Sequence, residues 1–317
     1  MTLNLNFKEI LESQEKFSQN FYDKNLLNSK DKEEILKTLC LGLQQETSQI
    51  VSSTNFKVYN KENYELNKGN LLFGIVDSMR YLFALSNLYD ITPEEIVSSY
   101  QQKDIFLNKQ LELKDRKYSG QNVIVVDIDD IICDFRGYFN NWLEVNYSVK
   151  IDPNSTSYYT TKEVKEIGLS PEVVFETFLD KDEMLNIPLL PGAKEFLDYA
   201  NSKNIYIQLL TSRPEGHLKC RYQTYAWLEK NNVYYDSISF APEKYIWLSK
   251  KDYYLENKVI FAIDDSPKHS LEYASHGVDV VVPDLPYNKG AVDDRIKRFI
   301  REDFFCELKK LIWNLFV

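Results

Sequence analysis

Cysteine, glycine and proline are all scarce in this chain. Its 317 residues include four cysteines, ten glycines and ten prolines. The cysteines lie far apart and form no CxxC pair, which argues against a zinc site or a disulfide framework. They are Cys40, Cys133, Cys220 and Cys306. Basic residues are outnumbered too, and the net charge of -10 disfavours broad binding to a nucleic-acid backbone. The net charge does not exclude binding of a small phosphorylated ligand, because such a ligand needs only a local cationic pocket.

Two further features are missing from the sequence. The first residues, "MTLNLNFKEILESQEKF", do not join a basic stretch to an apolar core, so we expect no signal peptide. No apolar run approaches the length of a membrane span, so we expect no membrane partner. A composition of 44% hydrophobic and 14% aromatic residues is typical of folded globular proteins. We therefore expect a soluble, cytoplasmic protein, long enough for two ordinary domains.

The first part of the chain, residues 1–118, has helical periodicity. In "DKEEILKTLCLGLQQETSQIV" the apolar residues recur at helical spacing. In "NKGNLLFGIVDSMRYLFALSNLYDI" they nearly surround the helix, which predicts a helix buried among its neighbours. A further helix is predicted at "TPEE", with Thr92 as its cap and Pro93 in its first turn. This part is predicted to be an all-α bundle.

The second part, residues 119–317, alternates short β-branched runs with helical segments. The runs are "VIVVDI", "IYIQLLT", "VIFAIDD" and "VDVVVPD". This alternation predicts a doubly wound α/β domain with a parallel sheet. The stretch from about 135 to 186 separates the first strand from the helix after Pro191, and it is too long for a plain connection. We expect it to form a helical cap inserted over the ligand site.

Polar residues follow several of these predicted strands. A carboxylate at the end of an apolar strand is costly unless something offsets its charge. Ligands of doubly wound sheets bind beyond the carboxyl ends of the strands, where these residues fall. The candidate site residues are Asp127 and Asp129 in "VVDIDD", Thr211 and Ser212 in "LLTSRP", Lys244 in "APEKY", and Asp264 and Asp265 in "FAIDDSP".

The order of these four signals resembles the haloacid dehalogenase (HAD) superfamily of phosphatases, whose motifs are DxD, Ser/Thr, Lys and DD. Within it, "DIDDIICDF", "PLLPGAKEFLDYA", "LLTSRP" and "PYN" are similar to the 5′(3′)-deoxyribonucleotidases. One departure is Asp130, where the family usually has glycine after DxD. Aspartate tolerates the tight turn expected there better than most residues.

The resemblance implies a chemistry for each residue. Asp127 would be the nucleophile that forms an aspartyl-phosphate, and Asp129 the general acid and base. Asp127, the main-chain carbonyl of Asp129, and the pair Asp264 and Asp265 would hold Mg²⁺, which prefers oxygen ligands. The phosphoryl oxygens would be bound by Thr211, Ser212 and Lys244.

The substrate implied by this resemblance is a 5′-(deoxy)nucleoside monophosphate. The alternatives are another small phosphoester, a nucleic-acid phosphate end, or a catalytically silent protein that binds nucleotides or a partner. Aromatic faces in the cap can stack a nucleobase, although most aromatic residues of a small helical cap form its core. The cap aromatics are Phe139, Trp142, Tyr147, Tyr158, Tyr159, Phe175 and Phe178.

The first part is similar to the all-α nucleoside-triphosphate pyrophosphatases of the dimeric dUTPase kind, through "LQQETSQIV", "NFKVY" and the segment from "LLFGIVD" to "FLNKQ". Those enzymes place four carboxylates around Mg²⁺ from ExxE and ExxD helices. Here Glu46 and Asp77 match, but Gln49 and Gly74 occupy the other two positions, and the glycine is expected to leave a gap. We expect a non-catalytic domain. A weakened nucleotide site and simple helix contacts remain alternatives, and the resemblance implies homodimerisation through these helices.

Overall fold

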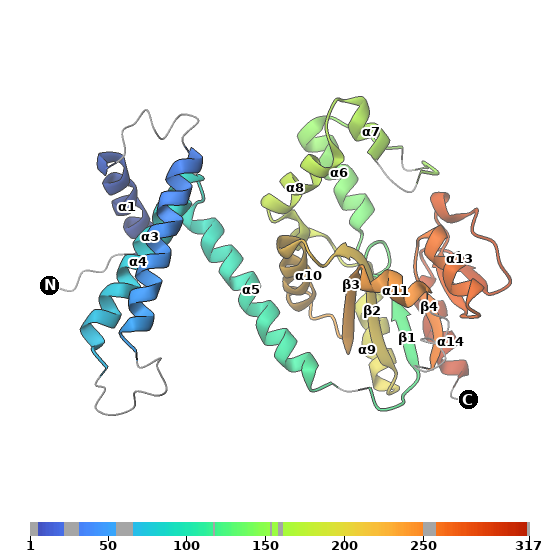
Figure 1. Cartoon of the computed structure of the whole chain (residues 1–317). Helices are drawn as coiled ribbons and strands as arrows, with labels where there is room; N and C mark the ends of the chain where they lie inside the picture. Colours follow the sequence, from blue (N-terminus) through green and yellow to red (C-terminus); the bar gives the residue numbers. More distant parts are fainter. Residues whose placement is uncertain are drawn as a thin grey trace. The chain divides into compact units, whose positions relative to one another are not determined.

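The computed structural model describes residues 6–21, 32–54, 66–116, 118–152, 154–157, 161–249 and 258–315. The "NFKVY" segment, Tyr158 and Tyr159 lie outside these ranges. Contacts between residues divide the chain into two compact units, Met1–Tyr100 and Gln101–Val317 (Figure 1). The division falls inside a helix that ends at Lys114, close to the change of sequence pattern near residue 118.

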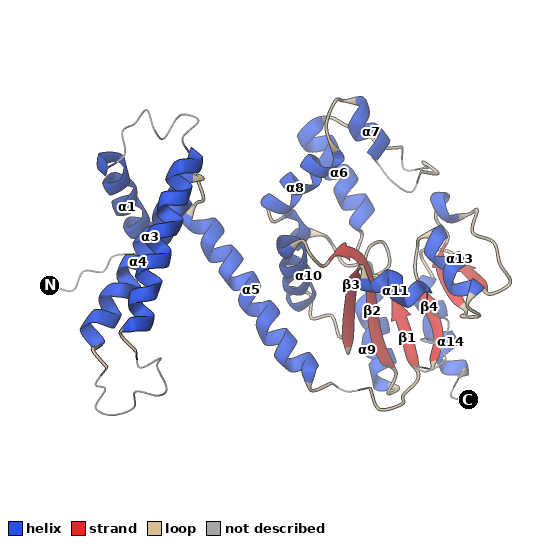
Figure 2. Ribbon diagram, viewed as in Figure 1, coloured by secondary structure: helices blue, strands red, loops and turns tan. Residues whose placement is uncertain are grey.

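In the described part of the first unit, the regular elements are all helices (Figure 2). Its helices are α1 (Phe7–Phe21), α3 (Lys32–Ser52), α4 (Lys68–Leu88) and the start of α5 (Pro93–Lys114). As predicted, α5 begins in a capping box. The Thr92 main-chain nitrogen donates to Glu95 Oε2 (2.7 Å), and the Glu95 nitrogen donates to Thr92 Oγ1 (3.2 Å).

Helices α3 and α4 approach each other closely at two glycines. A Cβ at Gly74 would lie 2.9 Å from Cγ1 of Ile50, and a Cβ at Gly42 would overlap the ring of Tyr81. The expectation of a gap at Gly74 is therefore wrong, because Ile50 fills that space. The buried core of this helix pair is small and consists of Ile35, Leu39, Ala84 and Leu88.

One face of α4 is apolar and exposed. Its exposed side chains include Leu72, Phe73, Ile75, Val76, Met79 and Leu82. The expectation that this helix is buried all round is therefore wrong within the described chain. By length and composition alone, α4 is also long and apolar enough to cross a membrane, so the expectation that no segment reaches that length is wrong as well.

The second unit contains a six-stranded parallel sheet, which confirms the doubly wound α/β prediction. The strand order is β3-β2-β1-β4-β5-β6. Strands after β1 are added first on one side of it and then on the other, so the order reverses between β1 and β4. In such sheets the crevice for a ligand opens at this reversal. The strands are β1 (Val123–Val126), β2 (Tyr206–Pro214), β3 (Ser237–Ala241), β4 (Val259–Ile263), β5 (Val280–Pro283) and β6 (Ile296–Phe299).

Both faces of the sheet are covered. Alternate residues of β1 belong to two different cores: Ile124 and Val126 to one, Val123 and Val125 to the other. The first core includes side chains from α9, α10 and α14, and the second includes Tyr273 from α13. The helices of this layer arrangement are α9 (Ala193–Ser202), α10 (Leu218–Lys230), α11 (Glu243–Ser249), α13 (Pro267–Ser275) and α14 (Phe304–Asn314).

The chain between β1 and α9 is helical and lies beyond one end of the sheet (Figure 1). It comprises α6 (Phe135–Tyr147), α7 (Thr161–Glu166), α8 (Pro171–Asp180) and the short η1 (Glu183–Asn186). Trp142 and Phe178 are buried and meet edge to face, with ring centroids 5.2 Å apart. Phe139, Tyr147 and Phe175 are partly buried against the same core. The described cap aromatics are thus mainly core residues.

Candidate active site

The candidate residues gather where three neighbouring strands end. Asp127 directly follows β1, Asp264 and Asp265 directly follow β4, and Thr211 lies in the last part of β2. The Asp127 main-chain nitrogen donates to the Ile263 carbonyl (2.9 Å), which ties the ends of β1 and β4 together. Because β1 pairs with both β2 and β4 in parallel, residues far apart in sequence meet at one edge.

A buried lysine joins two of the carboxylates. Lys244, from α11, is completely buried, and its Nζ lies 3.1 Å from Asp127 Oδ1 and 3.0 Å from Asp264 Oδ2. Burial disfavours an ammonium ion, but the two carboxylates outweigh it and raise the pKa of Lys244. The lysine therefore stays charged and neutralises part of the cluster.

Asp264 and Asp127 respond differently to the same surroundings. Burial tends to raise the pKa of Asp264, but Lys244 and His269 outweigh it and hold that pKa at about 2. The His269 Nδ1 atom lies 3.3 Å from Asp264 Oδ2, and the Ser266 nitrogen donates to Asp264 Oδ1 (2.9 Å). For Asp127, burial raises the pKa and Lys244 lowers it, while the nearby carboxylates of Asp264 and Asp129 raise it further. The net result is a pKa of about 8. The cluster therefore lacks enough positive charge to hold every carboxylate ionised.

Three carboxylates are arranged to fit a divalent cation. Oxygen atoms of Asp127, Asp264 and Asp265 all lie within 4.8 Å of one another, and all three residues are buried. Among the described residues, Asp265 Oδ1 has no hydrogen-bond partner. Burial and the neighbouring carboxylates raise the pKa of Asp265 well above its ordinary value. These three carboxylates therefore suit Mg²⁺, which prefers oxygen ligands. The ion would bind the unpaired oxygen of Asp265 and offset the excess negative charge.

The Asp129 side chain is bonded to a residue that our sequence reasoning missed. Arg213 Nε donates to Asp129 Oδ2 (3.0 Å), and Arg213 Nη2 donates to Asp129 Oδ1 (2.6 Å). The three carboxylates that could hold a metal ion do not include Asp129. The signal for Arg213 was the "TSRP" motif, in which an arginine directly follows the two candidate residues Thr211 and Ser212.

The two hydroxyls of "TSRP" differ in exposure. Thr211 is completely buried, and its Oγ1 accepts a hydrogen bond from the Arg213 main-chain nitrogen (3.2 Å). Ser212 is exposed at the end of the strand. Alternation along β2 explains the difference, because successive side chains point to opposite faces.

Asp130 and the "PYN" motif lie next to the carboxylates of the candidate metal site. Asp130 adopts the left-handed conformation (φ 58°), and its Oδ1 accepts from the Arg136 nitrogen (2.9 Å). Tyr287 donates to Asp265 Oδ2 (2.7 Å), while Asn288 Nδ2 donates to the Asp265 carbonyl (3.1 Å). Burial raises the pKa of Asp130 to about 6. The Asp265 carboxylate is thus held in place by side chains from η2 (Pro286–Asn288).

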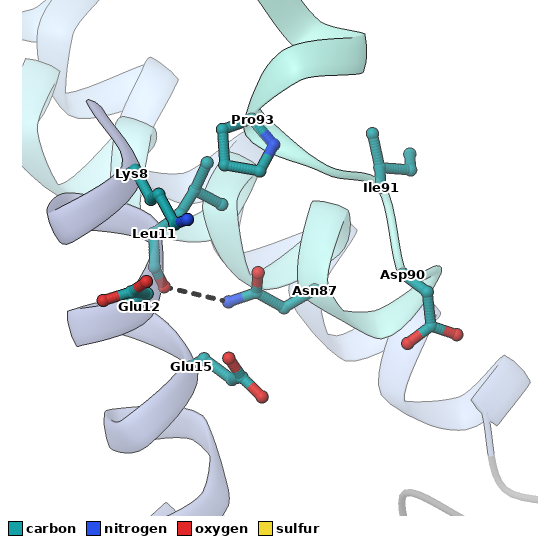
Figure 3. A pocket seen from close by; sticks show the side chains of 8 residues that line it. All are labelled: Lys8, Leu11, Glu12, Glu15, Asn87, Asp90, Ile91 and Pro93. Atoms are coloured by element: carbon teal, nitrogen blue, oxygen red, sulfur yellow. Dashed lines mark hydrogen bonds between the residues drawn. The ribbon is translucent and has the colours of Figure 1, made fainter.

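Pockets also form between described residues of the helical unit. Glu46 and Asp77 line the same pocket of roughly 410 Å³, together with Arg80 and Tyr81. Gln49 is exposed, and Gly74 is buried against Ile50. Another pocket, of roughly 280 Å³, is shown in Figure 3 and contains none of the predicted site residues. Its lining residues are Lys8, Leu11, Glu12, Glu15, Asn87, Asp90, Ile91 and Pro93.

No protein-family model and no curated protein matches the chain. Similar solved structures are HAD-superfamily hydrolases and phosphatases. A HAD-superfamily hydrolase from Ehrlichia chaffeensis has 17% identity over 63% of this chain and 100% of its own, with a TM-score of 0.36. A predicted phosphatase from Clostridium acetobutylicum has 14% identity over 62% and 100%, with a TM-score of 0.42. A HAD family hydrolase from Deinococcus radiodurans R1, with bound phosphate and sodium, has 13% identity over 62% and 96%, with a TM-score of 0.43. At these identities and TM-scores a shared function does not follow.

Proposed function

We propose that this protein is a magnesium-dependent phosphatase that works through an aspartyl-phosphate. The observation that supports it best is the buried group of Asp127, Asp264 and Asp265 around Lys244, at the end of the sheet where β1 and β4 finish. A buried cluster with more carboxylates than cations is costly unless it serves a ligand. A divalent cation offsets the excess negative charge and matches the oxygen donors of the cluster, and it also screens the charge of an incoming phosphate group.

The reaction uses the chain's own residues in two steps. In the first, a carboxylate oxygen of Asp127 attacks phosphorus, the bond to the ester oxygen breaks, and Asp129, which enters this step protonated, gives its proton to that oxygen. In the second, Asp129 removes a proton from water, which attacks the phosphoryl group and regenerates the Asp127 carboxylate. Lys244 and Thr211 bind phosphoryl oxygens. Asp127, Asp264, Asp265 and the main-chain carbonyl of Asp129 would hold Mg²⁺, which would supply positive charge against the phosphate.

The substrate we propose is a 5′-(deoxy)nucleoside monophosphate. Support comes from the "DIDDIICDF" and "PYN" motifs, and from the position of Tyr287 and Asn288 directly against Asp265. A nucleic-acid phosphate end fits less well, because the chain carries a net charge of -10. A silent binding protein would not need the complete set of Asp127, Lys244 and Asp264 in contact. Another small phosphoester remains the alternative. A cytoplasmic location belongs to the same proposal and agrees with four free cysteines.

The experiment is phosphate release by the full chain from nucleoside monophosphates, sugar phosphates and 5′- and 3′-phosphorylated DNA ends, with Mg²⁺. We expect the highest kcat/KM for a nucleoside monophosphate. A preference for a sugar phosphate or a DNA end would contradict the proposed substrate but would still support the phosphatase reaction. No phosphate release from any member of the panel would contradict the proposal.

For the helical unit we propose no catalysis and a second copy of this chain as partner. The apolar face of α4 needs a covering surface, and its own helix pair buries only a small core. A membrane fits less well, because Asp77 and Arg80 lie near the middle of α4, where charge in a bilayer is costly.

A further inference from the structure

Arg213 makes the only described ion pair of the Asp129 side chain. Its guanidinium group approaches with two nitrogens, Nε at 3.0 Å from Oδ2 and Nη2 at 2.6 Å from Oδ1. This is the two-pronged geometry in which arginine matches a carboxylate plane. The third nitrogen, Nη1, donates to Thr224 Oγ1 on α10 (3.0 Å). The guanidinium plane is therefore fixed on both sides.

Burial makes this arrangement rigid. The side chain of Arg213 is 4% exposed, whereas that of Asp129 is 27% exposed. The cation is thus enclosed by protein and the carboxylate has an open side. A buried guanidinium group is costly without a partner, so Arg213 and Asp129 stabilise each other's position. Each carboxylate oxygen has two lone pairs, and Arg213 uses one on each. Cys133 Sγ also donates to Oδ1 (3.5 Å), so Oδ2 is the oxygen with a lone pair left to carry a proton for a substrate.

We propose that Arg213 is a positioning residue for Asp129: it holds the carboxylate plane in the orientation that delivers a proton to the leaving oxygen. This inference rests on the proposed phosphatase function. It adds a residue that does not touch the phosphate and that lysine cannot replace, because an ammonium group binds as a point charge and does not orient a plane.

The rival role for Arg213 is purely structural, since it also links β2 to α10 through Thr224. The two roles differ in how the activity lost on substitution of Arg213 depends on the leaving group of the substrate. An alkyl phosphate, such as a nucleoside 5′-monophosphate, needs a proton on its departing oxygen. An aryl phosphate, such as p-nitrophenyl phosphate, releases a stable phenolate and needs the proton far less. General structural damage would lower turnover of both esters alike.

The test compares the full-length parent with Arg213→Lys, Asp129→Asn, the double variant and Thr224→Val. The measured quantity is kcat/KM for both esters, because it covers the steps up to departure of the leaving group. For Arg213→Lys we expect a loss of about 100-fold with the alkyl ester and less than about 5-fold with the aryl ester, following the usual size of general acid catalysis. Asp129→Asn should show the same split, and the double variant should be no worse than Asp129→Asn.

Thr224→Val is the matched control, because it removes the other partner of Arg213 and leaves the contact with Asp129. It should change both esters by a similar, small factor. Equal losses for the two esters in Arg213→Lys would overturn the inference while leaving the phosphatase proposal standing. If the parent released phosphate from neither ester, the phosphatase proposal itself would fall, and the inference with it. Thermal unfolding of each variant shows whether a loss comes from misfolding.

Discussion

At the scale of single residues, the site is organised by Lys244. A completely buried ammonium group is tolerated because two carboxylates lie within 3.1 Å of it. The same lysine leaves Asp265 without a cation, since its Oδ1 has no hydrogen-bond partner among the described residues. One lysine cannot neutralise three carboxylates, and the remaining charge is what a metal ion would bind.

Asp127→Asn should abolish phosphatase activity, by at least about 1,000-fold, because an amide cannot form the aspartyl-phosphate. The fold should persist, because asparagine has nearly the same shape and Lys244 keeps Asp264 as a partner at 3.0 Å. The measurement is phosphate release, with circular dichroism and thermal unfolding as the control for folding. Turnover comparable to the parent, in protein free of contaminating phosphatase, would remove Asp127 from the nucleophile role.

Replacing both Asp264 and Asp265 with Asn should weaken Mg²⁺ binding by more than the roughly 10–100-fold typical of losing an outer partner of a metal site. The reason is that both carboxylates belong to the buried group within 4.8 Å. Isothermal titration with Mg²⁺ is the measurement. Asp129→Asn is the matched control and should keep its affinity, because its side chain is engaged by Arg213. Unchanged affinity in the double variant would place the ion elsewhere.

At the scale of helices, the packing of α3 against α4 leaves no room for the four carboxylates of the dUTPase-like pattern. Glu46 and Asp77 still line one pocket. At the third position, however, a Cβ on Gly74 would lie 2.9 Å from Ile50. A glutamate there would have to push the two helices apart. The glycine is therefore a packing feature of this helix pair.

Gly74→Glu should destabilise the helical unit by about 1–3 kcal/mol, the usual cost of overpacking. Thermal unfolding measures it, and Gln49→Glu is the matched control, because Gln49 is exposed and accepts a carboxylate without a clash. Equal stability of the two variants would show that the helices can separate at no cost.

The helical unit should not release pyrophosphate from dUTP, dCTP or dTTP with Mg²⁺ or Mn²⁺. Two of the four carboxylates are absent, so the pocket cannot hold and orient ions against a triphosphate. The assay uses the full chain carrying Asp127→Asn, so that the second unit is silent. Its control adds Glu46→Gln and Asp77→Asn. Pyrophosphate release well above that control would contradict the expectation.

Phe73→Asp should disrupt self-association through α4. Phe73 is 68% exposed on the apolar face, and a charge there is costly to bury in an interface between copies. Light scattering after size-exclusion chromatography should show a dimer for the parent and a monomer for Phe73→Asp. Val145→Asp is the control, because Val145 is as exposed but lies on α6. A monomeric parent at every concentration would refute the proposed partner.

At the scale of the whole molecule, the parallel sheet explains how residues from 127 to 265 form one site. Parallel strands present their carboxyl ends at the same edge, and β1 has β2 on one side and β4 on the other. Asp127, Thr211 and Asp264 therefore meet although they lie in separate segments. The helical unit has its own core and its own pockets, so each unit can be tested by substitutions within it.

Local sequence missed β3 and β6, but it was sufficient for the other four strands, for the Thr92 cap and for the carboxylates at strand ends. Each depends on neighbours along the chain: β-branched runs favour strands, and a cap needs a partner three residues away. Only the tertiary structure decided that Arg213 holds Asp129, that Tyr287 contacts Asp265, and that one face of α4 stays uncovered. An apolar pattern shows which face of a helix avoids water, but what covers that face, and which distant side chain a buried carboxylate meets, depends on how the elements pack.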